Sequence, residues 1–194
     1  MPGKVLLPLN GHTVIGEVLT RCKRIPGVDE VVCTIPLGEE NNKLADAVSC
    51  YCTLHRWPDE NDVLGRYYNA AWTYEADIIV RVTGDCPLIS PEICGAVVAE
   101  FKRWNPGIAR NLGPKGFNCE VFGFKLLQQA NFGAADHYDR EHVTPWMYQN
   151  ATRHEVHNFS LDTEDDYRII LAAFGERVQP AGSSDHPVGA VAGA

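Results

Sequence analysis

The chain has 194 residues, 45% of them hydrophobic and 22% charged, which is an ordinary composition for one globular domain with a sizeable core. Its formal net charge of -8 disfavours a nucleic-acid polymer as partner, because proteins that bind one usually carry a basic face. No apolar run approaches the roughly 20 residues that cross a bilayer, and the proline-interrupted N-terminus is unlike a signal peptide, so we expect no membrane span.

Hydrophobic periodicity predicts helices that alternate with strands along the chain. Thr13 and Asp62 are expected to cap their helices, and Pro145 is expected to interrupt a helix. Residues 107–116 have the composition of a loop. The predicted helices cover residues 13–24, 42–51, 62–74, 91–103, 139–149 and 163–174, and the predicted strands cover residues 30–35, 77–82, 119–124 and 155–161.

The clearest strand is predicted at residues 77–82, whose continuous apolar run is typical of a central parallel strand covered on both faces. Strands alternating with helices indicate an α/β fold with a doubly wound, mostly parallel sheet between helical layers. Residues 178–194 are rich in small residues and are predicted to form a disordered tail. The expected organisation is therefore one domain over residues 1–177 followed by this tail.

The seven cysteines are scattered along the chain. Their odd number, without repeated Cys-x-x-Cys pairs, favours reduced thiols in a cytoplasmic protein over a disulfide framework. Cys50 and Cys52 flank one tyrosine, but no second pair stands at zinc-finger spacing. We therefore expect a cytoplasmic protein without a zinc site.

Two aspartates follow predicted strands at positions where ligands bind in such sheets. Gly84 and Asp85 come after residues 77–82, where a glycine frees the backbone and a carboxylate offers a hard oxygen ligand. Asp162 follows residues 155–161. Magnesium is commonly held by one or two carboxylates with substrate phosphates, so this pair can form a metal site. Alternatively, Asp162 caps a helix and Asp85 stabilises a turn.

Several short blocks occur in one order between residue 1 and about residue 174, namely residues 2–8 (Pro-Gly-Lys-Val-Leu-Leu-Pro), 62–68 (Asp-Val-Leu-Gly-Arg-Tyr-Tyr), 81–89 (Arg-Val-Thr-Gly-Asp-Cys-Pro-Leu-Ile), 120–122 (Glu-Val-Phe), 140–145 (Arg-Glu-His-Val-Thr-Pro) and 161–165 (Leu-Asp-Thr-Glu-Asp). With these blocks the sequence resembles the cytidylyltransferases of the spore coat polysaccharide and acylneuraminate (CMP-sugar synthetase) type. The resemblance implies a three-layer, Rossmann-like fold of the nucleotide-diphospho-sugar transferase type.

The resemblance also implies a reaction. A sugar hydroxyl attacks the α-phosphate of CTP, so that CMP passes to an acidic keto-sugar for surface polysaccharide or glycoconjugate synthesis and pyrophosphate leaves. Such a transfer depends on positioning and charge neutralisation. By the family pattern, Asp85 and Asp162 hold Mg²⁺ and Lys4 neutralises phosphate. Relatives often form dimers, so a homodimer is one assembly to test.

The remaining site residues are implied less directly. Arg81 is expected to contact the nucleotide or to brace the turn, and an arginine in an apolar strand also needs an anionic partner, which leaves a structural ion pair open. Glu120 is expected on the sugar side, and Gly84, Glu141 and His142 at the substrate. His142 is the most plausible general base, because its ordinary pKa is near neutrality, although a helix-packing role fits its position equally well.

The pattern departs from the family at its start. The family has a β-strand and a triphosphate-wrapping loop before Pro2-Gly-Lys4, whereas this chain begins at Met1. We expect the sheet to lack that central strand and its two neighbours to have unpaired edges. Three hypotheses follow: a magnesium-dependent cytidylyltransferase, a non-catalytic homologue that binds sugar or nucleotide or serves as an assembly subunit, and a nucleotidyltransferase for another base or an alcohol acceptor.

Overall fold

The computed structural model describes residues 3–112 and 116–156. Its helices are α1 (Val14–Cys22), α2 (Asn42–Ser49), α3 (Val63–Thr73), α4 (Pro91–Trp104), α5 (Phe124–Gly133), α6 (His137–His142) and α7 (Pro145–Asn150), with 3-10 turns η1 (Lys4–Leu6) and η2 (Glu39–Asn41). Its strands are β1 (Pro8–Leu9), β2 (His12–Thr13), β3 (Val32–Pro36), β4 (Thr53–Trp57), β5 (Ile78–Arg81), β6 (Ile108–Asn111), β7 (Glu120–Gly123) and β8 (Arg153–Val156). Within these ranges, no helix combines the length and the apolarity that a membrane crossing requires.

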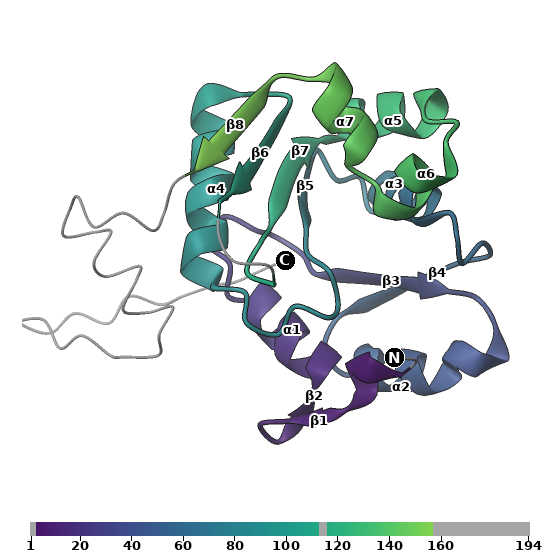
Figure 1. Ribbon diagram of the computed structural model, residues 1–194. Helices are drawn as coiled ribbons and strands as arrows, with labels where there is room; N and C mark the ends of the chain where they lie inside the picture. Colours follow the sequence, from purple (N-terminus) through teal and green to yellow (C-terminus); the bar gives the residue numbers. More distant parts are fainter. Residues whose placement is uncertain (1–2, 113–115, 157–194) are drawn as a thin grey trace, which may run out of the picture.

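The strands form two main groups (Figure 1). β3 and β4 pair in parallel, while a four-stranded sheet has the order β5-β7-β6-β8. β7 runs antiparallel to both β5 and β6, and β8 runs parallel to β6. Consequently β5, β6 and β8 share one direction and only β7 opposes them. A small antiparallel hairpin, β1–β2, precedes α1.

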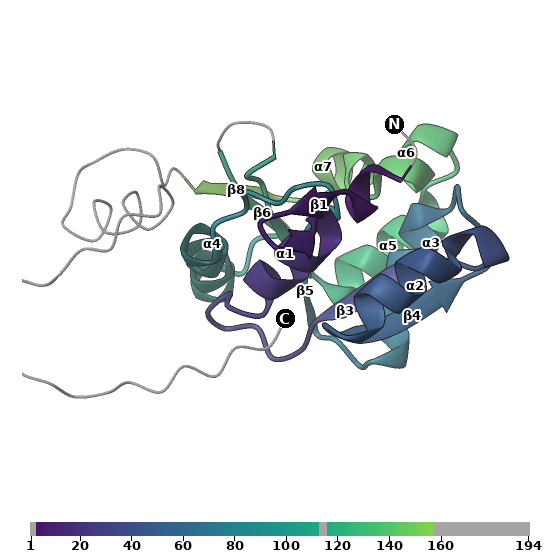
Figure 2. The ribbon, with the colours of Figure 1, turned by 90° about the horizontal axis from the view of Figure 1, so that it is seen from below.

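The four-stranded sheet is covered on both faces, which gives three layers (Figures 1 and 2). Neighbouring residues of β7 show this directly, since Val121 belongs to one buried core and Phe122 to the other. The first core contains residues of α1 and α4, and the second contains residues of α3, α5 and α7. The predicted α/β class is therefore confirmed.

β5 differs from its prediction in one respect. The apolar run correctly indicated burial on both faces, because Ile78 and Val80 pack against the first core while Ile79 lies in the second. However, its partner in the sheet is the antiparallel strand β7. An apolar run reports covered faces and carries no information on the direction of a neighbouring strand, so the expectation of parallel neighbours at this position was wrong.

The expected gap in the sheet is present. Among the described residues, β3 pairs only with β4 and β5 pairs only with β7. Each of these two strands therefore has one edge without a strand partner in residues 3–112 and 116–156. Within the described part of the chain, this is the arrangement that was expected for these two neighbouring strands.

Several elements were not predicted. β6 lies inside residues 107–116, which were expected to be a loop, and neither β4 nor α5 was expected. The helix predicted at residues 139–149 is broken into α6 and α7, and Pro145 begins the second of them, as its missing N–H favours. The strand predicted at residues 155–161 begins earlier, at Arg153. Its remainder, the helix predicted at residues 163–174 and the predicted tail lie outside the described residues.

The predicted caps and thiols are confirmed. Thr13 accepts a hydrogen bond from the Gly16 backbone N–H at the start of α1, and Asp62 does the same for Gly65 at the start of α3. All seven cysteines are free. The Asp62 carboxylate also binds the Arg140 guanidinium, with 2.8 Å between Oδ1 and Nε, so one side chain both caps α3 and ties α6 to it.

Replacing Asp62 with alanine is therefore expected to destabilise the protein by about 2 kcal/mol, because a helix cap and a charge-assisted hydrogen bond are lost together. Urea unfolding measures the change. Asp46→Ala is the control, since Asp46 is an exposed residue of α2 with no side-chain hydrogen bond among the described residues. Equal unfolding midpoints for the two variants would show that Asp62 does not join the two helices.

Candidate functional site

A tight turn after β5 presents Asp85 at the carboxyl end of the strand. The backbone N–H of Cys86 donates to the Thr83 carbonyl at 3.1 Å, and the Thr83 hydroxyl lies 2.8 Å from the Cys86 sulfur. These contacts fix the turn while leaving 41% of the Asp85 side chain exposed. The carboxylate therefore faces solvent at the end of the strand, where ligands bind in α/β sheets.

Lys4 reaches Asp85 from the start of the chain. Its ammonium forms an ion pair with Oδ2 of Asp85, and 49% of the Lys4 side chain is exposed. This cation lowers the pKa of Asp85, and in return the Asp85 carboxylate raises the pKa of Lys4. Two of the three residues predicted for catalysis are thus brought together, and both remain accessible to a ligand.

Replacing Lys4 with methionine is expected to raise the pKa of Asp85 toward the ordinary aspartate value, because the hydrogen bond and the charge of Lys4 hold it down. Since the pKa is depressed, the stabilising effect of the pair is present above the ordinary aspartate pKa and is lost as the pH falls through the depressed one. A carboxyl NMR titration measures the shift. Lys125→Met, which removes an exposed lysine of α5, is expected to leave it unchanged.

A metal at this position would depend on few protein ligands. Asp85 supplies one hard, ionised oxygen donor, which fits the way Mg²⁺ is held by one or two carboxylates with substrate phosphates. Within residues 3–112 and 116–156, no three His, Cys, Asp or Glu side chains gather as a larger metal cluster. Asp162, the second predicted ligand, lies outside the described residues. The Asp85–Asp162 pair therefore stays a prediction.

Gly84 allows the chain after β5 to pack closely against α1. The sequence suggested that a glycine here frees the backbone, but Gly84 is not among the glycines with positive φ, so this reason was wrong. A Cβ added to Gly84 would lie 3.0 Å from Cδ1 of Ile15. The glycine thus lets the end of β5 approach α1 closely.

Arg81 has the anionic partner that an apolar strand requires. In the register of β5 and β7 it lies opposite Glu120, and its Nη1 is 2.5 Å from Oε2 of that carboxylate. Only 17% of the Arg81 side chain and 14% of the Glu120 side chain are exposed. The structural ion pair left open by the sequence is therefore the arrangement found.

Glu120 is held by two further side chains that the sequence did not single out. Its Oε1 accepts hydrogen bonds from the Thr144 hydroxyl at 3.0 Å and from the Tyr148 hydroxyl at 2.8 Å. Burial and the neighbouring Glu120 carboxylate raise the pKa of Tyr148, so the phenol stays protonated and donates. Thr144 belongs to the block at residues 140–145, which was the only sequence signal for these contacts.

Glu141 and His142 lie on α6 and are exposed. Glu141 lies 3.8 Å from Nδ1 of His137, one turn earlier, and the His142 ring packs edge-on against Tyr138 with 4.3 Å between ring centroids. Among the described residues, neither side chain hydrogen bonds to Asp85 or Glu120. Their substrate roles and the general-base role of His142 remain predictions, and the packing alternative describes the contact that His142 makes.

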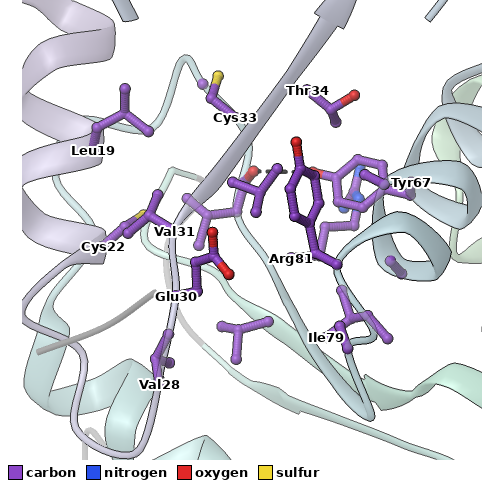
Figure 3. Close-up of a pocket in the computed structure, with 18 of the residues that line it drawn as sticks. Leu19, Cys22, Val28, Glu30, Val31, Cys33, Thr34, Tyr67, Ile79 and Arg81 are labelled. Carbon is purple, nitrogen blue, oxygen red and sulfur yellow. Dashed lines mark hydrogen bonds between the residues drawn. The ribbon is translucent and has the colours of Figure 1, made fainter. Parts of the chain in front are cut away.

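A cavity of about 720 Å³ opens between β3 and β5 beside this site. Arg81 lines it on the β5 side (Figure 3). Thr83 and Gly84, which follow β5, also line it. We call it the central cavity. The described chain thus places an exposed Lys4–Asp85 pair and a part-buried Arg81–Glu120 pair around the carboxyl end of β5, next to a hollow of substrate size.

Comparisons with known proteins identify the family of this chain. A cytidylyltransferase from Leptospira borgpetersenii is 30% identical, has a TM-score of 0.77, and matches over 84% of this chain and 73% of that one. The spore coat polysaccharide biosynthesis protein SpsF of Bacillus subtilis is 23% identical over 199 residues, covering 91% of this chain and 83% of that protein.

A 3-deoxy-manno-octulosonate cytidylyltransferase of Pelobacter propionicus is 36% identical over 95 residues, which cover 47% of this chain and 35% of that enzyme. In addition, the sequence pattern described as Cytidylyltransferase matches residues 1–177. These matches confirm the resemblance drawn from the short blocks and the predicted nucleotide-diphospho-sugar transferase type of fold. The chain belongs to the cytidylyltransferase family.

Proposed function

We propose that this chain transfers CMP from CTP to an acidic keto-sugar with release of pyrophosphate, in a reaction that depends on Mg²⁺. The observation that carries the proposal is the exposed Lys4–Asp85 pair at the carboxyl end of β5. A cation and a carboxylate held side by side at this position can receive a metal–triphosphate complex, with the metal at Asp85 and phosphate oxygens at Lys4.

Lys4 and Asp85 would act by positioning the substrates and by neutralising their charge. The sugar hydroxyl oxygen forms a bond to the α-phosphorus as the bond from that phosphorus to the bridging oxygen of pyrophosphate breaks. The hydroxyl proton is released to solvent. Asp85 would hold the metal, and Lys4 would stabilise negative charge on the leaving phosphates. A bound Mg²⁺ supplies further charge neutralisation. No covalent protein nucleophile is required for such a transfer.

The names of two relatives support the choice of acceptor. One relative is a 3-deoxy-manno-octulosonate cytidylyltransferase, and another is a spore coat polysaccharide biosynthesis protein. We infer an acidic keto-sugar destined for a surface polysaccharide. The Glu120 carboxylate would help to shape the sugar side, because Arg81, Thr144 and Tyr148 fix its oxygens in place.

The proposal is tested by pyrophosphate release with CTP, UTP, ATP or GTP in the presence of 3-deoxy-manno-octulosonate, with Mg²⁺ or with EDTA. Release is expected with CTP and Mg²⁺ and is expected to stop when EDTA is added. Equal release with UTP, or release only with an alcohol acceptor, would instead favour a related nucleotidyltransferase of different specificity.

A non-catalytic homologue is the second candidate. It is favoured by the cavity between β3 and β5 and by their facing edges, which have no strand partner among the described residues, since these lie directly beside the proposed nucleotide site. Calorimetry with CTP and Mg²⁺ separates the two. Binding of CTP without pyrophosphate release would identify a nucleotide-binding subunit, and absence of both would exclude CTP as a ligand of this chain.

A further inference from the structure

A row of four charged side chains crosses the four-stranded sheet. The strand register places Glu120 of β7 between Arg81 of β5 and Arg110 of β6. Glu155 of β8 lies on the far side of Arg110. Residues directly opposite one another in a sheet lie on the same face. Arg81, Arg110 and Glu155 each occupy the last or second-last position of their strands. The row therefore lies at the carboxyl ends of β5, β6 and β8, where ligands bind in α/β sheets.

The two arginines of this row differ in how firmly they are paired. Arg81 is held by Glu120, and only 17% of its side chain is exposed. Arg110 instead directs Nε and Nη2 to one oxygen of Glu155, at 3.1 and 2.5 Å, and these two side chains are 37% and 38% exposed. Because solvent screens an exposed ion pair, another carboxylate can replace Glu155 at little cost. Of the two arginines, Arg110 is the one that a ligand reaches more readily.

The Tyr148 ring holds the Arg110 guanidinium in place. Cζ of Arg110 lies 5.2 Å from the centre of that ring, which is close enough for cation–π attraction. The ring is itself fixed, because the Tyr148 hydroxyl donates to Glu120 at 2.8 Å. A contact through the ring face requires none of the guanidinium N–H groups. These groups form a planar fork that matches a carboxylate with two parallel hydrogen bonds. The arrangement therefore favours a planar anion as ligand.

The spacing of the strands suits the proposed acceptor. β7 lies between β5 and β6, so about 10 Å separates the axes of β5 and β6, twice the usual strand spacing. In an acidic keto-sugar the carboxylate is attached to the carbon that carries the reacting hydroxyl. A metal at Asp85, the α-phosphate, that carbon and the carboxylate would follow one another across this distance. The carboxylate would then reach the carboxyl end of β6, where Arg110 lies.

We propose that Arg110 binds the carboxylate of the acidic keto-sugar, and that Glu155 takes the place of that carboxylate when no sugar is bound. The sugar carboxylate accepts the hydrogen bonds that Nε and Nη2 otherwise donate to Glu155, and the Glu155 side chain turns to solvent. Arg110 thereby selects acidic over neutral acceptors. This inference rests on the proposed function, because it assigns a position to the acid group of the proposed acceptor.

The test measures binding of 3-deoxy-manno-octulosonate by calorimetry. Mg²⁺ is present with a CTP analogue in which a methylene group replaces the oxygen between the α- and β-phosphates, so that no transfer occurs. Arg110→Met is expected to weaken binding by about tenfold to a hundredfold, because charge-assisted hydrogen bonds are lost. Arg110→Lys keeps the charge without the fork and is expected to lie between. Arg103→Met is the control, since Arg103 forms an exposed pair with Glu100 on α4, and it is expected to have no effect.

Glu155→Gln gives the sharper result, because its expected effect has the opposite sign. Removing the internal carboxylate frees Arg110 for the ligand, so binding of the sugar acid is expected to tighten by about threefold. The carboxamide of the same sugar is expected to bind the unchanged protein and Arg110→Met equally. Equal affinity of the unchanged protein and Arg110→Met for the acid would overturn the proposal. Weaker binding by Glu155→Gln would do so too, since Glu155 would then support the site.

Pyrophosphate release by the same variants with CTP separates this inference from the proposed function. Binding of the sugar acid that depends on Arg110, without any release of pyrophosphate, would support the inference and contradict the proposed reaction. Release with a KM for the sugar acid that Arg110→Met leaves unchanged would support the reaction and overturn the inference. If the unchanged protein neither binds the sugar acid nor releases pyrophosphate, both are wrong.

Discussion

Replacing Asp85 with asparagine is expected to lower the rate of pyrophosphate release by about a hundredfold to a thousandfold. The substitution keeps the size of the side chain but removes the negative charge, so the exposed carboxylate that would hold the metal at this end of β5 is lost. Loss of a single electrostatic contact to a developing charge typically has effects of this size. Turnover with CTP and Mg²⁺ measures it.

The fold is expected to tolerate the same substitution. The Lys4–Asp85 pair is exposed, and exposed ion pairs contribute little to stability because solvent screens them. Asp77→Asn is the matched control, because Asp77 is an exposed aspartate next to the opposite end of β5 and is expected to retain full activity. If Asp85→Asn turns over as fast as the unchanged protein, Asp85 is not a metal ligand.

Replacing Glu120 with alanine is expected to destabilise the protein by about 3 kcal/mol or more. The change leaves the Arg81 guanidinium with only 17% of its side chain exposed and without its carboxylate, and an uncompensated buried charge is costly. The Thr144 and Tyr148 hydroxyls also lose their acceptor. The free energy of unfolding in urea measures the effect.

Two further variants distinguish the cost of leaving the Arg81 charge without a partner from a general loss of stability. The double variant Arg81→Met with Glu120→Leu removes both charges and is expected to recover most of the stability, because apolar residues often replace a buried ion pair at little cost. Glu155→Ala breaks a pair of equal length, 2.5 Å to Arg110, whose side chains are 37% and 38% exposed. It is expected to cost less than about 1 kcal/mol. A Glu120→Ala variant no less stable than Glu155→Ala would contradict this account.

Local sequence patterns predicted several of the helices and strands. The elements that were missed have sequences with weak local patterns. α1 and α3 have clear periodicity and capping residues at Thr13 and Asp62, so their starts were predicted. β4 was missed because every residue in it is half-buried and its sequence mixes polar and apolar types. β6 was missed because four residues flanked by turn-forming sequence carry too little signal against a loop.

The site was predictable only in part. Lys4 and Asp85 were named from their blocks, but their contact joins residues 81 positions apart, which no local pattern reports. The pairing of Arg81 with Glu120 depends on strand register, and the sequence indicated only that Arg81 needed an anion. Tyr148 was not singled out, because an aromatic residue in a short helix has the pattern of a core position.

The most direct test of the central claim is to look for the product. The protein is incubated with CTP, Mg²⁺ and 3-deoxy-manno-octulosonate, and the mixture is analysed by mass spectrometry. The account predicts a CMP ester of the sugar acid that accumulates together with pyrophosphate and is nearly absent with Asp85→Asn. Unchanged CTP and free sugar acid, with folded protein present throughout, would contradict it.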